Sequence, residues 1–349
     1  MKRITLCALL MTLFLLLSCG SGTTSAEDPK TTFLNSIANL GKGFLDVFTS
    51  LSDMVTGAFG INAETKKSDI GKYFTSIEKT MTSVKKKLNI VVAENGNYPK
   101  VKEVVDNFIT DTLDKIAEGA KIAASGATTD TDIGGAPKEG QNAAPADTSS
   151  VNALVKGIGQ IVEIVLKKDE GKADATKTGD TEKKSIGKLF GTKDADGAEA
   201  HAAAASASIG AVTGADILKA IARSGETADN SKNIEEAKDA ASIASAKKED
   251  DKKEIKEAAR KDAVIAAGIA LRAMAKDGKF AANQNAKDAD AVNGVAANAV
   301  GKTLSTLIIA IRNTVDSGLR SISDALATVT QEDKSAEITT PADSTASGQ

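Results

Sequence analysis

The sequence predicts an all-α protein, an elongated bundle of several helices. Two observations indicate this fold class. Apolar residues recur every three or four positions through the first third of the chain and again near its end, which is the period of an amphipathic helix. Between them lies an alanine-rich stretch, residues 198–299, and alanine is the residue with the highest helix propensity.

The chain begins with the layout of a secretory signal. Lys2 and Arg3 form a short cationic start, and an apolar run extends from Leu6 to Leu17. A helix of that length reaches only about 18 Å, whereas the hydrocarbon core of a bilayer is about 30 Å thick. We therefore expect residues 1–18 to be a lipoprotein export signal that is removed, and not a permanent membrane span.

The signal ends in Leu16-Leu17-Ser18-Cys19, which resembles the bacterial lipobox. Leu16, Leu17 and Ser18 then form the recognition site of the signal peptidase, and Cys19 carries S-diacylglycerol and an N-acyl chain. Transfer of the diacylglyceryl group requires a cysteine because a thiolate is a strong nucleophile. Two or three acyl chains hold a protein stably on a membrane, whereas a single acyl chain gives only marginal binding. We expect lipid attachment at Cys19.

Residues 19–30 are expected to form a flexible tether, because glycine and serine dominate its first half and favour an unfolded coil. Cys7 is lost with the signal. If Cys19 is acylated, the mature chain has no free thiol and no disulfide, so its stability must come from a packed core.

Three amphipathic helices are predicted to open a single helical domain that covers residues 31–330. They lie within residues 31–59, 70–91 and 101–116, the last one after Pro99. The apolar face of the first helix consists of Phe33, Ile37, Leu40, Phe44, Phe48, Leu51 and Val55.

Three polar segments without helical period are predicted to be surface loops. They are residues 125–150, 169–185 and 191–199, and a further helix is predicted between the first two, at 151–168. Substitutions in exposed loops barely disturb folding, so we expect these segments to vary freely and to bind antibodies.

Residues 261–281 are predicted to lie mostly inside the protein. Val264, Gly268, Leu271 and Ala275 fall on one face of a helix, which Gly278 can end as a left-handed C′ residue. We expect antibodies to this segment to bind intact cells poorly.

The domain closes with a strongly apolar helix at residues 302–330, and residues 331–349 are predicted to be a disordered tail. Because Cys19 ties the start of the domain to a membrane, the helices at 31–59 and 302–330 are expected to pair near the membrane. The loop-rich end of the bundle is then distal.

Charge and motifs exclude several classes of function. The mature chain has 42 basic and 47 acidic residues, hence a net charge of −5, which argues against nucleic-acid binding. Gly301-Lys302-Thr303 resembles part of a phosphate-binding loop, but Ala296 stands where that loop requires glycine. His201 is the only histidine. We therefore expect no catalytic, cofactor-binding or metal-binding residues, and no enzyme activity.

The sequence resembles the variable large proteins, also called variable major proteins, of relapsing-fever spirochaetes. The resemblance covers nearly the whole chain, and three segments carry much of it. These are Phe33-Leu34-Asn35-Ser36-Ile37, Lys66-Lys67-Ser68-Asp69-Ile70-Gly71-Lys72-Tyr73-Phe74, and residues 261–281, which run from Lys261-Asp262-Ala263-Val264 to Gly278-Lys279-Phe280-Ala281. The last segment also looks like a helix of the variable surface lipoprotein of Lyme-disease spirochaetes.

The resemblance implies a surface-exposed antigen, anchored in the outer membrane by lipid, whose partners are host antibodies. Switching among alternative versions would give antigenic variation and immune evasion. The alternative is a surface module that binds host serum proteins, as a complement regulator or an adhesin does. A lipid anchor, a helical scaffold and variable loops are physically compatible with the first function.

Overall fold

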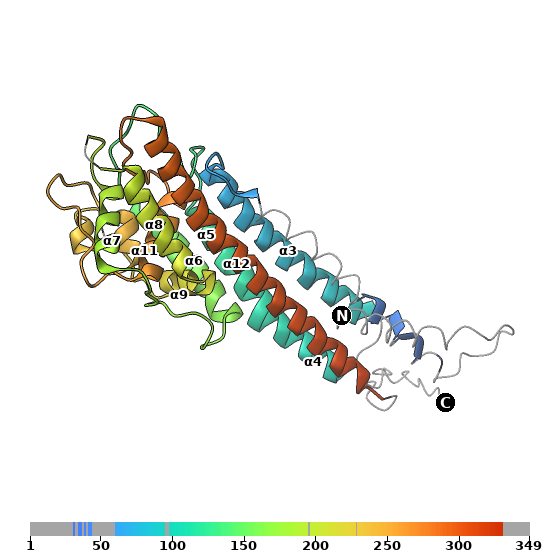
Figure 1. Ribbon diagram of the computed structural model, residues 1–349. Coiled ribbons are helices and arrows are strands. Elements are labelled where there is room, and N and C mark those ends of the chain that lie inside the picture. Colours follow the sequence, from blue (N-terminus) through green and yellow to red (C-terminus); the bar gives the residue numbers. More distant parts are fainter. Residues whose placement is uncertain are drawn as a thin grey trace, which may run out of the picture. The chain divides into compact units, whose positions relative to one another are not determined.

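The computed structural model describes residues 60–330, except 95–97, 195 and 228, and nine residues between 31 and 43 (Figure 1). The predicted signal, Cys19, the tether and the tail lie outside the described residues. The chain divides into two compact units. Unit 1 comprises Met1–Thr49, Lys86–Asn107 and Leu319–Gln349, and unit 2 comprises Ser50–Lys85 and Phe108–Gly318.

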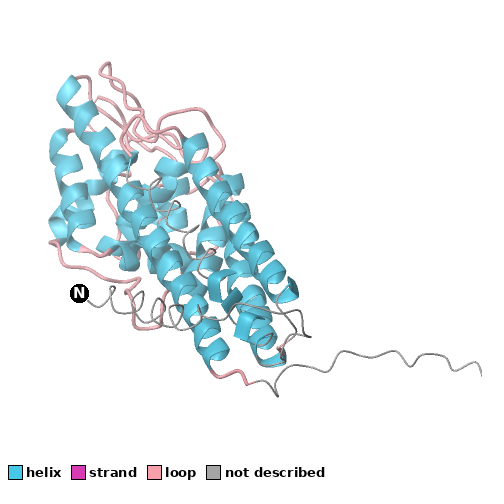
Figure 2. Ribbon diagram, turned by 90° about the vertical axis from the view of Figure 1, so that its right-hand side faces the viewer, coloured by secondary structure: helices cyan, strands magenta, loops and turns pink. Residues whose placement is uncertain are grey.

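The described part of the chain is helical, with irregular loops and four isolated β-bridges but no strand (Figure 2). This confirms the all-α prediction. The helices, in chain order, are α3 (Lys67–Glu94), α4 (Pro99–Phe108), a π-helical turn (Ile109–Leu113), α5 (Asp114–Ser125), α6 (Thr148–Val165), α7 (Asp180–Ser185), a 3-10 helix (Ile186–Phe190), α8 (Glu199–Ala211), α9 (Gly214–Ala222), a 3-10 turn (Ile234–Glu236), α10 (Ala240–Ser245), α11 (Asp262–Met274) and α12 (Ala286–Ala327).

The predicted apolar stripe of residues 70–91 forms the buried face of α3. Burial of such a stripe against neighbouring helices is what stabilises an amphipathic helix in a protein. The buried side chains are Ile70, Phe74, Ile77, Met81, Val84 and Leu88.

The helix predicted after Pro99 forms α4 and α5 with a π turn between them. Its apolar residues Val101, Val105, Ile109 and Leu113 recur at strict steps of four, which drifts away from the period of 3.6. The wider π turn at Ile109–Leu113 compensates for that drift, and all four side chains are buried.

Helices α5 and α6 approach each other closely because glycines face each other. A Cβ atom on Gly157 would lie 2.4 Å from Gly119 O and 2.4 Å from Ala123 N, both backbone atoms. Helix α6 starts at the carboxylate of Asp147, which accepts a hydrogen bond of 2.8 Å from Ser150 N.

The three segments predicted to be free surface loops are partly buried, so that prediction is wrong for many of their residues. In 125–150, Gln141 pairs with Ala282 and Ala144 pairs with Lys279 through backbone bridges, and Ala146 is fully buried. Segment 169–185 contains α7, and in segment 191–199 Asp196 is only 1% exposed. Buried backbone needs hydrogen-bond partners, and apolar periodicity does not report them.

Helix α11 is buried on nearly every side, as predicted for residues 261–281, and Val264 is its only half-buried residue. The predicted helix end is wrong, because α11 ends at Met274 and Gly278 does not have a positive φ. Asp277 has φ 62° instead. Position 278 requires glycine because a Cβ atom there would lie only 2.2 Å from Arg272 O.

The closing helix is longer than predicted, because α12 begins at Ala286 and its buried stripe includes Val292, Val295 and Val300. By length and composition α12 could cross a membrane, but 56% of its most apolar window is buried in the protein, as in a core helix. Helices α8 and α9 pass the same test only together, and they are bent by 96°.

The predicted pairing of residues 31–59 with 302–330 can be followed at one place, within unit 1. Residues 41–43 are helical, and a Cβ atom on Gly41 would lie 3.9 Å from Leu326 Cδ2. Residues 44–59 are outside the described part of the chain, so the remainder of the pairing and its position near a membrane stay predictions.

Replacement of Gly157 by alanine should lower the free energy of unfolding by about 1–3 kcal/mol or more, because backbone of α5 must move to admit the methyl group. Gly294 is the matched control, since it lies in α12 with nothing within 4 Å of its Cβ position. Gly294→Ala should stabilise the protein by about 0.5–1 kcal/mol. Urea denaturation followed by circular dichroism measures both changes, and equal effects would contradict the close approach.

Candidate functional site

The predicted lipidation site, Leu16 to Cys19, lies outside the described residues, so its chemistry remains a prediction. Within the described residues, no group of three or more His, Cys, Asp or Glu side chains could hold a metal ion. Two residues that the sequence singled out have structural roles. His201 Nδ1 accepts a hydrogen bond from Ala198 N at the start of α8, and Lys302 Nζ donates to Ile209 O at its end.

His201 is half-buried, and not the solvated histidine that the sequence suggests. Burial lowers its pKa, and the nearby positive charge of Lys188 lowers the pKa further. Its neutral ring is therefore the form that accepts the hydrogen bond from Ala198 N.

The most unusual feature of the described residues is a set of buried charged side chains around α11, the helix within residues 261–281. Arg272 is 0% exposed. Its Nη1 donates to Ala244 O and Ala246 O at 3.0 Å each, and its Nε donates to Lys279 O at 2.9 Å. The guanidinium thus satisfies carbonyl groups at the end of α10, which have no partner inside their own helix.

Two rings hold the Arg272 side chain in place. The Arg272 guanidinium carbon lies 4.8 Å from the centroid of the Phe190 ring and 5.9 Å from that of Phe280. The rings themselves meet edge to face, 5.9 Å apart. A cation over aromatic faces is stabilised by about 0.5–2 kcal/mol. Phe190 and Phe280 are the only Phe, Tyr or Trp residues between 109 and 349, and both rings pack against the Arg272 guanidinium.

Lys67, the first residue of α3, performs the same task at the end of α11. Its side chain is 2% exposed, and Nζ donates to Ala275 O at 2.6 Å, Gly278 O at 2.8 Å and Arg272 O at 3.4 Å. Burial lowers the pKa of Lys67 to about 7, and the charge of Arg272 acts in the same direction. The ammonium group is held by carbonyl oxygens alone in these three contacts.

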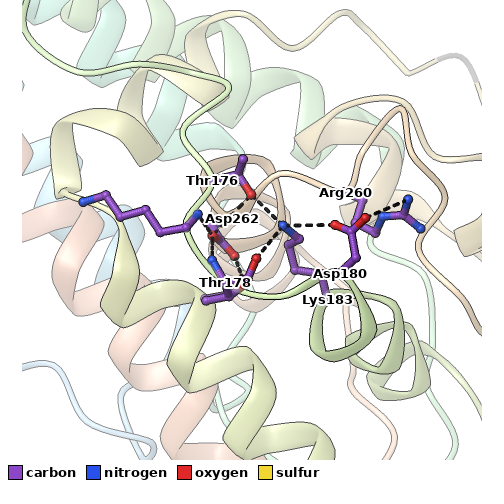
Figure 3. Close-up of polar contacts among 8 residues, drawn as sticks. Thr176, Thr178, Asp180, Lys183, Arg260 and Asp262 are labelled. Atoms are coloured by element: carbon purple, nitrogen blue, oxygen red, sulfur yellow. Dashed lines mark hydrogen bonds and ion pairs between the residues drawn. The ribbon is translucent and has the colours of Figure 1, made fainter.

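Asp262 provides the opposite charge at the start of α11 (Figure 3). It is 0% exposed, and its Oδ2 accepts hydrogen bonds from the backbone N–H groups of Lys177 at 2.5 Å and Thr178 at 2.8 Å. Its Oδ1 accepts from the hydroxyls of Thr178 and Ser208. Burial alone would raise the pKa of Asp262, but these hydrogen bonds lower it overall.

A third buried cation, Lys183, lies beside Asp262. Lys183 Nζ donates to Thr176 Oγ1 at 2.7 Å and to Thr178 O at 2.9 Å, and it lies 3.4 Å from an oxygen of Asp180. Asp180 also pairs with Arg260 at 3.5 Å. The polar segment 169–185 is therefore fixed to α11 through Asp262, and Lys183 links residues within the segment.

Unit 2 also contains an open depression of ≈ 690 Å³. Its lining includes Asn62, Glu64, Asp132, Asp290 and Asn293. Asp132 is paired with Lys66 at 2.7 Å, and the Asn293 amide bonds both the N–H and the C=O of Ala136. Asn293 therefore holds the 132–137 loop against α12, and Asp132 ties the same loop to Lys66.

Sequence reasoning missed the roles of Lys67, Asp262 and Arg272. One signal was available, because Arg272 is the only charged residue between Ala263 and Ala275. A charge inside an apolar helix is rarely buried without dedicated partners.

A profile of the Borrelia lipoprotein family matches residues 44–326. The chain belongs to this family. It is 64% identical to variable large protein 4 of Borrelia hermsii over 98% of each chain, and 63% identical to variable large protein 17 over 100% of this chain and 98% of that one.

Among solved structures, this Borrelia lipoprotein is similar to the Lyme disease variable surface antigen VlsE of Borrelia burgdorferi. The TM-score is 0.72 at 35% identity, over 83% of this chain and 97% of that chain. Both findings confirm the family resemblance read from the sequence.

The buried amine of Lys67 should make stability depend on pH. Its pKa is about 7 in the folded protein and 10.5 as the ordinary value, so between these pH values the unfolded chain binds a proton that the folded protein does not. The free energy of unfolding should therefore rise with pH, by about 1–2 kcal/mol from pH 7.5 to 9.

Urea denaturation of the native chain and of Lys67→Met at pH 7.5, 8.2 and 9 measures this rise, which the substitution should remove. Lys66→Met is the control, because the neighbouring Asp132 raises the pKa of Lys66 out of this range. Burial lowers the pKa of Arg272 to about 9, so Arg272 adds to the rise only toward pH 9. A rise from pH 7.5 to 8.2 that persists in Lys67→Met would contradict the assignment.

Proposed function

We propose that this Borrelia lipoprotein is a surface-exposed variable antigen, anchored in the outer membrane through lipid on Cys19. Replacement of one version by another lets the bacterium evade host antibodies. The observation that carries the proposal is the similarity to variable large proteins over 98% of the chain, which covers the buried core and the polar exterior alike.

The distribution of constraint in the structure supports such a role. Asp262, Lys67 and Arg272 are buried and hydrogen-bonded, and removal of one partner from a buried polar network leaves other groups unsatisfied. Residues such as Lys138, Glu139 and Asp169 are exposed, and exposed substitutions usually change stability by no more than about 0.5 kcal/mol. The exterior can therefore change while the core keeps its structure.

A role without catalysis is supported by the relatives, whose names describe antigens and variable proteins. The capture of a host serum protein is the alternative that the sequence left open. Binding of purified mature protein to serum components would detect that activity separately.

The mature protein should begin at Cys19, with diacylglycerol on sulfur and an acyl chain on nitrogen. Mass spectrometry of the amino-terminal peptide tests this expectation, and Cys19→Ala should remain unlipidated. An amino-terminal peptide that begins at Cys19 without added lipid mass, or that still carries residues 1–18, would show the anchor to be wrong.

Antibody selection of a clonal population should replace the expressed coat sequence. We expect the surviving cells to express versions that differ mainly at positions exposed here, whereas the equivalents of Lys67, Asp262 and Arg272 stay the same. Sequencing of the expressed transcript before and after selection measures both. Survivors that still express the original sequence on their surface would contradict antigenic variation.

A further inference from the structure

One exposed face of α3, within unit 1, combines an apolar side chain with two cations. Ile90 is 53% exposed, more than Leu34 or Ile309, the other exposed large hydrophobic side chains of the described residues. Lys86 and Lys87 are exposed and lie one helical turn before Ile90, so the three side chains share one face. An isolated exposed isoleucine is ordinary, but the lysines beside it make this face amphipathic.

A shallow groove of ≈ 260 Å³ adjoins this face. Its lining includes Asn89, Val92 and Ala93 of α3 and Val105 of α4. Lys102 and Asp106, which also line it, are paired with each other. The groove therefore extends the apolar part of the surface without adding an unpaired charge.

The proposed lipid anchor lies within reach of this face. A Cβ atom on Gly43 would lie 2.4 Å from Val91 Cγ2, so the chain near residue 43 abuts the residue that follows Ile90. Gly43 follows Cys19 by 24 positions. A coil of that length would span about 27 Å on average, which brings Ile90 within reach of the headgroup region.

From these observations we infer that the face formed by Lys86, Lys87 and Ile90 rests on anionic phospholipid headgroups of the membrane that holds the anchor. The inference depends on the proposed function for the anchor. The lysines face the negatively charged headgroups, and Ile90 enters the boundary between headgroups and acyl chains. The contact fixes the orientation of unit 1 on the membrane, which attachment at Cys19 alone would not.

The test uses the full lipidated chain with a nitroxide label on Ile90→Cys, reconstituted in vesicles of phosphatidylcholine with phosphatidylglycerol. Because the Cys19 sulfur is alkylated, the introduced cysteine is the only free thiol. Power-saturation measurements compare collisions of the label with oxygen, which partitions into lipid, and with a water-soluble nickel chelate. We expect the ratio of oxygen to nickel collisions to rise at least about threefold over the chain in detergent-free buffer.

Ile309→Cys is the matched control, because Ile309 is 45% exposed, lies in unit 2 and follows the neutral residues Ser305 and Thr306 by one turn. Its label should stay in water. Adding Lys86→Glu and Lys87→Glu, or omitting phosphatidylglycerol, should return the Ile90 label to the control value. An Ile90 label as accessible to nickel as the Ile309 label overturns the inference, and spin–spin broadening without vesicles would assign the face to a second copy instead.

Mass spectrometry of the same preparation separates failure of the anchor from failure of this contact. If the chain carries no lipid, a Cys19→Ser chain with an amino-terminal hexahistidine tag is tethered to chelating lipid loaded with diamagnetic zinc in the same vesicles. The label at residue 90 then supports or overturns the membrane contact by the same comparison.

Discussion

The structure depends on satisfying the two ends of a helix that has no access to water. Four N–H groups at the start of a helix and four C=O groups at its end have no partner within the helix. For a surface helix water supplies these partners, but every residue of α11 except Val264 is buried. At its start Ala263 N donates to Ala175 O, and at its end Lys67 Nζ donates to the carbonyls of Ala275 and Arg272. The charges of Asp262 and Lys67 also match the positive and negative ends of the helix dipole.

The same solution recurs throughout the alanine-rich region. Arg272 donates a hydrogen bond to Ala244 O at the end of α10. Lys302 donates to Ile209 O at the end of α8, and Lys219 Nζ donates to Leu166 O at the end of α6. Each cation comes from another segment of the chain, so each contact also fixes two segments relative to each other. The helices of unit 2 are thus located by specific polar contacts as well as by apolar packing.

The fold could be predicted from the sequence wherever helices have one apolar face and one polar face. Helices α3, α4, α5 and α6 were found in this way, because their buried side chains repeat at the helical period. The π turn at Ile109–Leu113 was not predicted, although strict steps of four apolar residues are its signal. The paths of residues 125–150 and 169–185 were missed for a different reason. Hydrogen bonds to distant residues such as Ala282 and Asp262 leave no periodic trace in the local sequence.

Burial of a charge is costly, and the lowered pKa of Lys67 shows that its carbonyl partners do not fully replace water. Lys67 therefore serves specificity better than it serves stability. Alanine side chains are small and similar, so a core made of them discriminates weakly between alternative helix positions. A buried ammonium must meet three particular carbonyl groups, and a shifted helix would leave the charge without them. In the variable antigen proposed here, such contacts would keep one structure when the surrounding residues no longer specify it.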